Sequence, residues 1–376
     1  MILLRTLLFL VLLALGTAPA RAFDTTAQAA IMIDFRTGAV LFEKNPDEPR
    51  PPASMSKLMT AYMAFDALRA GRLKLDDMLP VSEQAWKMGG SQMFLEVGDR
   101  VAVKDLLRGI IIQSGNDACV VMAEALAGSE AAFAEQMNAK AKELGLTSSS
   151  FRNASGLDEP GHLMSVRDLA TLARRIITEF PDFYPIYSEI EFTYAGIKQQ
   201  NRNPLLHSKV PGVDGMKTGH TDDAGYGLVA SAKRGDQRLI LVIAGMESPR
   251  ARAAEAERLL EYGFREFKEY TLFPAGQPVR DVAVWLGEKP RLPLVPQQTV
   301  AVTLSREARQ GMVVKLVFDD PVAAPIAKDQ PVGRVEVTAP GTQPFTVPLL
   351  AGEAVAEAGM LGRLTGAFGY LVGWSS

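Results

Sequence analysis

The distribution of proline constrains the fold of this chain more than any other feature. Eleven of its 23 prolines fall between Pro274 and Pro348. Because proline lacks an amide hydrogen and clashes with the preceding helical turn, long helices are excluded from this stretch. Short alternating apolar runs remain there, at 279–286, 299–304, 313–318 and 333–338. They predict a small all-β domain in the C-terminal third of the chain.

The region before residue 270 has a mixed pattern. Strand-like runs at 29–34 and 39–43 flank a tight turn. The segment from about residue 55 to 179 is mostly helical by spacing, and an amphipathic helix is expected near 250–268. Three further strands are expected late in the region, at 213–219, 227–233 and 238–244. We therefore expect an α/β (α+β) fold, in which an antiparallel sheet flanked by helices combines the two ends of the region around a largely helical insert.

Residues 1–22 have the pattern of a secretory signal. Arg5 precedes an apolar run at 7–15, which is too short to cross a hydrocarbon core of ~30 Å as a helix. Ala20-x-Ala22 then fits a small-residue cleavage site. Cleavage would remove two arginines and take the formal net charge from −3 to −5. An uncleaved amino-terminal anchor is the alternative.

Residues 353–376 predict an amphipathic C-terminal helix. Its apolar stripe is formed by Leu361, Leu364, Phe368, Leu371 and Val372. Such a stripe can lie on a membrane surface, although Arg363 is the only cation and several glycines weaken the helix. Packing on the β domain, or a frayed tail, is the alternative. The predicted segments are thus a signal peptide (1–22), a mixed α/β domain (23–270), a β-rich domain (271–352) and this helix (353–376).

Composition restricts the chemistry that the chain can perform. Its 40 Lys and Arg residues are balanced by 43 Asp and Glu residues, so there is no basic excess for nucleic acid. A single cysteine, Cys119, excludes an intramolecular disulfide and a Cys-based zinc site, and three histidines leave little for a metal cluster. We expect no metal and no cofactor, with chemistry carried by Ser, Lys, Asn, Asp or Glu.

The first candidate site is Ser54-Met55-Ser56-Lys57, at the start of an apolar helix. Residues three apart share a helical face, so Ser54 and Lys57 can touch. A serine hydroxyl needs a base, but a lysine with the usual pKa of ~10.4 is protonated at neutral pH. Burial and a second cation would have to lower the pKa of Lys57 by ~3 units. By itself, the Ser-x-x-Lys spacing also occurs by chance in many helices.

Two further motifs could complete such a site. Ser114-Gly115-Asn116 lies at a turn and can present a hydroxyl and a carboxamide to a cleft, although these residues are also ordinary turn formers. Lys217-Thr218-Gly219 ends a predicted strand. There Lys217 can bind a carboxylate and lower the pKa of Lys57, while Gly219 permits close approach of a backbone. An exposed lysine at a strand end is the plain alternative.

Together and in this order, the three motifs resemble those of penicillin-binding proteins and serine β-lactamases. The chain is similar in particular to the low-molecular-mass penicillin-binding proteins that act as D-alanyl-D-alanine carboxypeptidases. The similarity covers roughly residues 24–268 and is clearest at 53–60, 108–118, 201–203 and 214–221. It implies a β-lactamase/transpeptidase-like fold, a β-rich second domain and a helix that anchors the enzyme to the membrane.

The resemblance also implies roles for the matching residues in bond cleavage. Ser54 would be the acylated nucleophile and Lys57 its base. Ser114 and Asn116 would relay the proton and bind the substrate amide. The backbone N–H groups of Ser54 and His220 would form the oxyanion hole.

Substrate binding is assigned in the same way. Lys217 and Thr218 would hold the terminal carboxylate of the substrate. Arg202 and Arg252 would add positive charge on that side, with Arg250 as a rival for Arg252. For each arginine, solvated surface charge is the alternative.

The activity implied is removal of the terminal D-alanine from peptidoglycan stem pentapeptides that end in D-Ala-D-Ala. β-Lactam antibiotics would acylate the same serine. A D,D-endopeptidase of cross-links is one alternative. A β-lactamase would need an acid that positions water, for which Glu159 is the only tempting residue, and a non-catalytic wall-binding scaffold is the alternative from another class. We expect an exported enzyme held peripherally at the periplasmic face of the inner membrane, with no nucleic acid partner.

Overall fold

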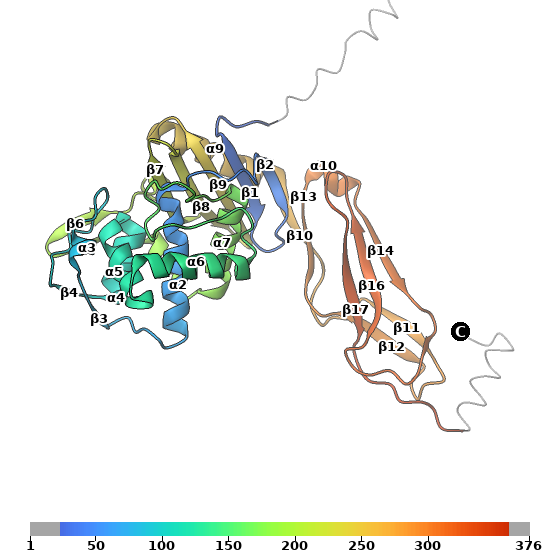
Figure 1. The fold of residues 1–376 in the computed structure, drawn as a ribbon. Helices are drawn as coiled ribbons and strands as arrows, with labels where there is room; N and C mark the ends of the chain where they lie inside the picture. Colours follow the sequence, from blue (N-terminus) through green and yellow to red (C-terminus); the bar gives the residue numbers. More distant parts are fainter. Residues whose placement is uncertain (1–22, 361–376) are drawn as a thin grey trace, which may run out of the picture.

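The computed structural model describes residues 23–360, which form two units joined end to end (Figure 1). The first unit contains a five-stranded sheet in the order β2-β1-β9-β8-β7, and all neighbouring strands are antiparallel. Its strands are β1 (Ala29–Asp34), β2 (Val40–Lys44), β7 (Val213–Thr221), β8 (Gly225–Arg234) and β9 (Gln237–Met246). Both ends of the region therefore meet in one sheet, which confirms the predicted α/β (α+β) fold.

The sheet is covered on both faces. Along β9, Leu241 belongs to the core beneath α9 (Pro249–Glu266), whereas its neighbour Ile240 belongs to the core on the other face. Because side chains of a strand alternate between faces, a continuous apolar strand needs a cover on each side. Helix α9 covers one face, and α7 (Val166–Glu179) with α2 (Lys57–Arg69) covers the other (Figure 1).

The segment between β2 and β7 packs around α2 as a largely helical insert. Its other helices are α3 (Glu83–Trp86), α4 (Val103–Arg108), α5 (Asn116–Ala127), α6 (Glu130–Leu144) and α8 (Pro204–His207). Two 3-10 turns, η1 (Ala53–Ser56) and η3 (Tyr184–Ser188), and one π turn, η2 (Gly109–Gln113), interrupt them. The helical pattern of this segment is confirmed at residues 103–113, where α4 continues into the π turn η2 from Gly109 onwards.

Two short hairpins in this insert were not predicted from its helical pattern. They pair β3 (Met78–Pro80) with β4 (Arg100–Ala102), and β5 (Glu191–Tyr194) with β6 (Ile197–Gln200). Each strand has only three or four residues, which is too few for a period of two to be recognised. The second hairpin leads directly into the predicted Asn201-Arg202-Asn203 stretch, so it helps to position a candidate site residue.

The second unit contains short strands, as the prolines predicted. A two-stranded ribbon pairs β10 (Phe267–Phe273) with β13 (Val300–Ser305), and a six-stranded sheet follows the order β14-β16-β17-β12-β11-β15. The six are β11 (Arg280–Trp285), β12 (Arg291–Pro296), β14 (Val313–Phe318), β15 (Val322–Ala323), β16 (Pro331–Thr338) and β17 (Phe345–Ala351). The short helix α10 (Arg306–Gln310) lies after β13. Strands β12 and β17 were missed because their own prolines obscured the alternation.

The two predicted terminal segments lie largely beyond residues 23–360. The predicted signal at 1–22, and residues 361–376 of the predicted C-terminal helix, lie outside the described residues. Residues 353–359 are not helical, which corrects the start of that helix, because Val355 and Glu357 form bridges with Ile326 and Gly287. The division into domains at residue 270 stays a prediction. Between residues 23 and 360, no helix is both long and apolar enough to span a membrane.

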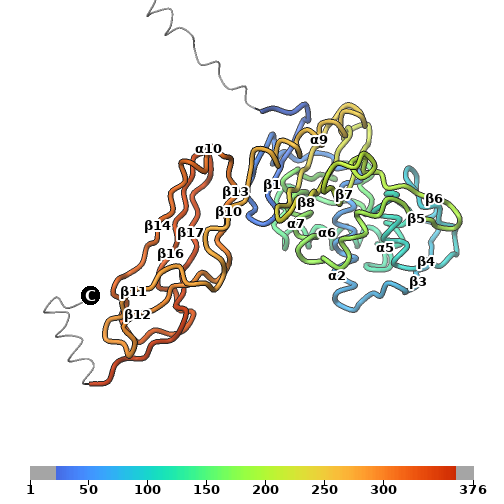
Figure 2. Tube along the Cα trace, turned by 180° about the vertical axis from the view of Figure 1, so that it is seen from behind, coloured from blue at the N-terminus to red at the C-terminus, as the bar shows by residue number. Residues whose placement is uncertain are grey.

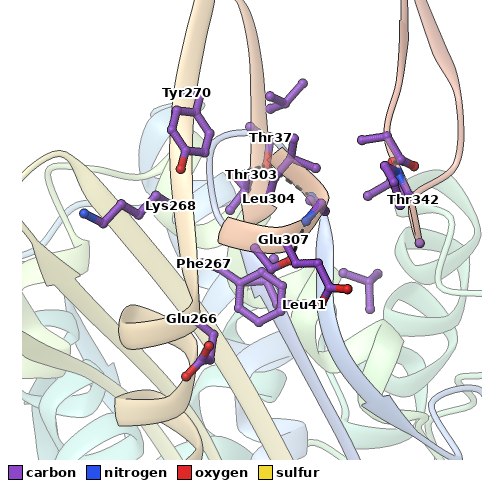
Figure 3. A pocket seen from close by; sticks show the side chains of 18 of the residues that line it. Thr37, Leu41, Glu266, Phe267, Lys268, Tyr270, Thr303, Leu304, Glu307 and Thr342 are labelled. Atoms are coloured by element: carbon purple, nitrogen blue, oxygen red, sulfur yellow. Dashed lines mark hydrogen bonds between the residues drawn. The ribbon is translucent and has the colours of Figure 1, made fainter. Parts of the chain in front are cut away.

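The two units touch through the turn between β1 and β2. Arg36 pairs with Glu269 and donates to Thr271 Oγ1 at 2.9 Å, and the hydroxyls of Thr37 and Thr303 lie 2.9 Å apart. Strands β10 and β13 run beside the first unit near β1 (Figure 2). Beside these contacts lies a groove of about 1620 Å³, lined from the edge strand β2 across to β13 and α10 (Figure 3). The second unit is therefore attached at the β2 edge of the sheet, four strands away from β7.

Candidate active site

Ser54 and Lys57 lie where η1 passes into α2. The turn begins at Ala53, a buried residue with a φ of 47°, a backbone region that residues with a side chain seldom adopt. This sharp turn leaves Ser54 partly exposed while Lys57 is 1% exposed. Lys57 Nζ lies 2.9 Å from Ser54 Oγ. The sequence spacing therefore does bring the hydroxyl and the amine into contact.

The amine of Lys57 has two further oxygen partners. Nζ donates to Asn116 Oδ1 at 2.7 Å and to the backbone carbonyl of Ser155 at 2.6 Å. Three acceptors match the three donors of an ammonium, whereas a neutral amine can donate to these two oxygens and accept from the hydroxyl of Ser54. Burial lowers the pKa of Lys57 to about 8, and the positive charge of Arg202 acts in the same direction. A neutral base at this position is thus accessible near physiological pH.

Ser114 and Asn116 enter the site from the turn between η2 and α5. Ser114 has a φ of 70°, which ends the π turn and lets α5 begin at Asn116. The Asn116 side chain is fixed at both ends, because its Nδ2 donates to the Gly89 carbonyl at 2.7 Å while its Oδ1 accepts from Lys57. Ser114 is 2% exposed, and its Oγ has no hydrogen-bond partner within residues 23–360. A buried hydroxyl without a partner is available to a substrate or to water.

Lys217 reaches the site from β7, the edge strand of the sheet. The strand packs directly on η1, since a Cβ added at Gly219 would lie 2.8 Å from the Pro52 carbonyl oxygen. Lys217 and Gly219 are two apart and so share the face that meets η1. Lys217 is 2% exposed, and burial followed by the charge of Lys57 lowers its pKa well below the usual value. The expected meeting of Lys217 with the Ser54–Lys57 pair is therefore present.

The two buried lysines influence each other, as expected. Repulsion between the two ammonium groups disfavours the charged form of either amine, and Arg202 is a further cation that lowers the pKa of both lysines. Interacting cations titrate as a unit, so a proton gained by one amine disfavours a proton on the other. A carboxylate bound beside Lys217 would favour the charged form there and thereby the neutral form of Lys57.

The remaining predicted binding residues occupy the other face and the rim of this edge. Thr218 is 6% exposed and His220 is exposed. Arg252, on α9, is 8% exposed and its charge acts on Lys217, whereas its rival Arg250 is exposed. The structure thus favours Arg252. Arg202 is exposed on the rim, and its charge acts on both lysines.

Three supports of the site were not identified from the sequence. The Ser155 carbonyl that binds Lys57 belongs to a turn in which Asn153 Oδ1 accepts from the Gly156 amide at 2.7 Å. Asp117 accepts from the amides of Met93 and Leu95 and so holds the loop that carries Gly89. Asn-x-x-Gly is a recognisable turn signal, but nothing local links it to Lys57, 98 positions away in the chain.

His162 is the third support and lies beneath the nucleophile turn. It is 3% exposed; Nδ1 accepts from the Arg152 amide at 3.2 Å, so the proton sits on Nε2, which faces Ser56 Oγ at 2.8 Å. Burial, with the charges of Arg152 and Lys57, lowers the pKa of His162 to about 4. The neutral ring therefore belongs to the folded state.

Other hollows and clusters offer no competing centre. The groove of Figure 3 is lined by Leu41, Phe267, Tyr270 and their neighbours, and none of the predicted catalytic residues lines it. Strands β2 and β7 are the opposite edges of the sheet, roughly 19 Å apart at the usual strand spacing. Within residues 23–360, no group of three or more His, Cys, Asp or Glu side chains could hold a metal ion.

Known proteins share both the sequence and the fold. Residues 16–248 match the D-alanyl-D-alanine carboxypeptidase family, and residues 267–357 match the C-terminal domain of penicillin-binding protein 5. D-Alanyl-D-alanine carboxypeptidase DacC of Escherichia coli is 42% identical over 90% of this chain and 86% of its own length. Penicillin-binding protein 5 from Haemophilus influenzae, 37% identical, has a TM-score of 0.83 over 91% of this chain and 100% of that one. Penicillin-binding protein D2 from Listeria monocytogenes, solved in the ampicillin-bound form, is 32% identical with a TM-score of 0.59 over 64% and 98%.

The buried His162 predicts a specific loss of stability in acid. Its pKa lies below the unfolded value of ~6.5, so the unfolded state binds the proton first and stability falls as the pH drops from about 6.5 towards 4. At pH 4.5 this effect amounts to about 2–3 kcal/mol of unfolding free energy. Urea denaturation at pH 7 and 4.5 should show a smaller acid loss in His162→Gln than in the wild type. His207→Gln, at an exposed histidine, is the control, and equal acid losses in all three proteins would contradict the prediction.

Proposed function

Since this chain belongs to the D-alanyl-D-alanine carboxypeptidase family and is a serine D-Ala-D-Ala carboxypeptidase, we propose that it acts on peptidoglycan stem pentapeptides through an acyl-enzyme at Ser54. The observation that carries this assignment is the 2.9 Å contact between Lys57 Nζ and Ser54 Oγ. It joins a weak nucleophile to an amine whose buried setting favours the neutral, basic form. We propose that neither formation nor hydrolysis of the acyl-enzyme uses a metal or a cofactor.

Acylation begins with transfer of the Ser54 hydroxyl proton to Lys57. The oxygen attacks the carbonyl carbon of the penultimate D-alanine, and the negative charge on the carbonyl oxygen is stabilised by the N–H groups of Ser54 and His220. Collapse of this intermediate breaks the peptide bond, and the departing amine takes a proton from Lys57 through the Ser114 hydroxyl. Water then hydrolyses the ester, with Lys57 again accepting a proton, and restores Ser54.

The terminal carboxylate is bound at the edge of β7. Lys217 and Arg252 supply positive charge from the two faces of the strand, and the Thr218 hydroxyl donates a hydrogen bond. Arg202 on the rim strengthens the field. Binding a carboxylate at Lys217 favours the charged form of this lysine, and its charge in turn favours neutral Lys57. The substrate thus helps to create the base that attacks it.

β-Lactams are proposed to acylate the same serine, and hydrolysis of the resulting ester is proposed to be slow. Rapid release would require an acid that positions a hydrolytic water. Glu159, the candidate for this role, is exposed and its Oε2 accepts from Asn153 at 3.1 Å. It therefore serves the turn that carries Ser155, and a long-lived penicilloyl enzyme is expected.

We further propose that the enzyme is exported and held peripherally at the periplasmic face of the inner membrane. Support comes from the signal pattern at 1–22 and the amphipathic pattern of the tail. The described chain ends, in red, at the end of the second unit that is remote from the five-stranded sheet (Figure 1). A tail bound to the membrane there would hold the active site away from the bilayer.

The nucleophile is tested by intact-mass spectrometry after exposure to penicillin. The wild type should gain one adduct, and Ser54→Ala should gain none. Lys57→Ala should keep its fold, checked by circular dichroism, yet lose acylation and release of D-alanine from diacetyl-Lys-D-Ala-D-Ala. An adduct on Ser54→Ala, or full activity of Lys57→Ala, would remove this mechanism.

The base is tested by the pH dependence of kcat/KM for the same tripeptide. A neutral Lys57 is needed, so kcat/KM should rise with pH and level off above about 8. Arg202→Gln removes a cation that favours neutral Lys57, so its rise should shift to higher pH. Arg250→Gln removes an exposed arginine away from the site and should leave the midpoint in place. A flat wild-type profile between pH 6 and 9 would contradict the assignment.

The tail is tested by cosedimentation with anionic phospholipid vesicles. The mature chain should pellet with the vesicles, because the apolar stripe enters the interface. A chain ending at residue 360 should stay in the supernatant with an unchanged kcat/KM for the soluble tripeptide. Equal sedimentation of the two chains would argue against anchoring by the tail.

A further inference from the structure

Beyond the predicted motifs, an aromatic residue closes the outer end of the substrate edge. Tyr226 on β8 pairs across the sheet with His220 on β7, and the two rings stack with centroids 3.8 Å apart and planes inclined by 22°. Leu228, two residues along β8, lies in the core beneath α9, and Tyr226 packs against that core. Side chains two apart share a face, so the Tyr226–His220 stack stands on the α9 side of the sheet.

The same ring lies beside Arg252. The guanidinium carbon is 5.8 Å from the centroid of Tyr226, within the range of a cation–π interaction. Arg252 is 8% exposed, yet its direct polar contact is a long one, from Nη1 to the Gly227 carbonyl at 3.5 Å. Its Nε has no partner within residues 23–360. An arginine so poorly bonded needs another group to hold its orientation.

Tyr226 is placed to be that group. No carboxylate is paired with Arg252 in residues 23–360, so its donors are left for an anion. Its Nη1 faces the carbonyl of Gly227, which pairs across the sheet with Gly219, so Arg252 lies beside the strand edge that carries Lys217. The ring of Tyr226 therefore lies within cation–π range of Arg252 and also stacks on the exposed His220.

We propose that Tyr226 is a positioning residue that makes the enzyme selective for peptides ending in a free carboxylate, by holding Arg252 at the anion site and His220 at its outer end. This inference rests on the proposed function. A chain that continues past the scissile residue carries an amide there, which offers no charge to Arg252 and must pass the His220–Tyr226 stack. Tyr226 thus favours removal of a terminal residue over cleavage within a cross-link.

The test compares two substrates, diacetyl-Lys-D-Ala-D-Ala and its C-terminal amide. Tyr226→Met fills much of the same volume without an aromatic face. It should raise KM for the free acid about three- to tenfold, with kcat within about twofold, and should leave kcat/KM for the amide nearly unchanged. Tyr226→Phe keeps the ring and should restore most of the selectivity.

A double-mutant cycle shows whether the effect passes through Arg252. In an Arg252→Ala background, Tyr226→Met should cause little further loss for the free acid. Tyr262→Met, which removes an aromatic stack with Phe23 elsewhere on α9, is the matched control for packing. Thermal melting identifies any misfolded variant. If Tyr226→Met misfolds, the selectivity of Tyr226→Phe is compared with that of Tyr262→Met instead.

Unchanged selectivity in Tyr226→Met, or additive losses in the cycle, would overturn the positioning role. Equal losses for the acid and the amide would do the same, because they would indicate a general structural defect. Failure of the wild type to release D-alanine would instead overturn the proposed function, so the two failures can be told apart.

Discussion

Two lysine amines are buried where an edge strand meets the start of a helix, and the surrounding structure serves this contact. An ammonium loses much of its hydration when buried, so Lys57 and Lys217 each need polar partners or must shed a proton. Lys57 has three oxygen partners, Ser54 in η1, Asn116 in α5 and the carbonyl of Ser155. Within residues 23–360, the Lys217 amine donates a single hydrogen bond, to the carbonyl of Thr218 at 3.1 Å, so its other donors are available to an anion.

The backbone around the site is held in conformations that few residues adopt. Ala53, Phe94 and Ser114 all have positive φ values, between 47° and 70°. Such strain persists only where the neighbouring structure determines it. Asp117 fixes the loop containing Phe94 through the flanking amides, and the packing of β7 on η1 confines Ala53. The groups that react are therefore positioned by rigid surroundings before a substrate arrives, which reduces the reorganisation needed in the transition state.

The two-unit architecture separates chemistry from attachment. The site lies at the β7 edge of the five-stranded sheet, while the second unit contacts the turn beside the β2 edge through Arg36 and Thr37. These contacts are polar, and Phe267 at the start of β10 adds an edge-to-face contact with Tyr262 on α9. Each unit has its own hydrophobic packing, so a mutation in one core should mainly lower the stability of the unit that contains it.

Local patterns in the sequence were sufficient for the strands and helices of the sheet, for the all-β character after residue 270, and for the Ser54–Lys57 contact. These features depend on periodicity, proline chemistry and residues one helical turn apart. The short hairpins, the π turn and strand β12 have patterns too brief or too rich in proline to be read. Only the tertiary structure brings Ser155, His162 and Tyr226 to the site and shows that Arg202 adds to the effects that lower the pKa of Lys57. Burial and the distance between charges set those effects, and neither is a property of residues close together in the chain.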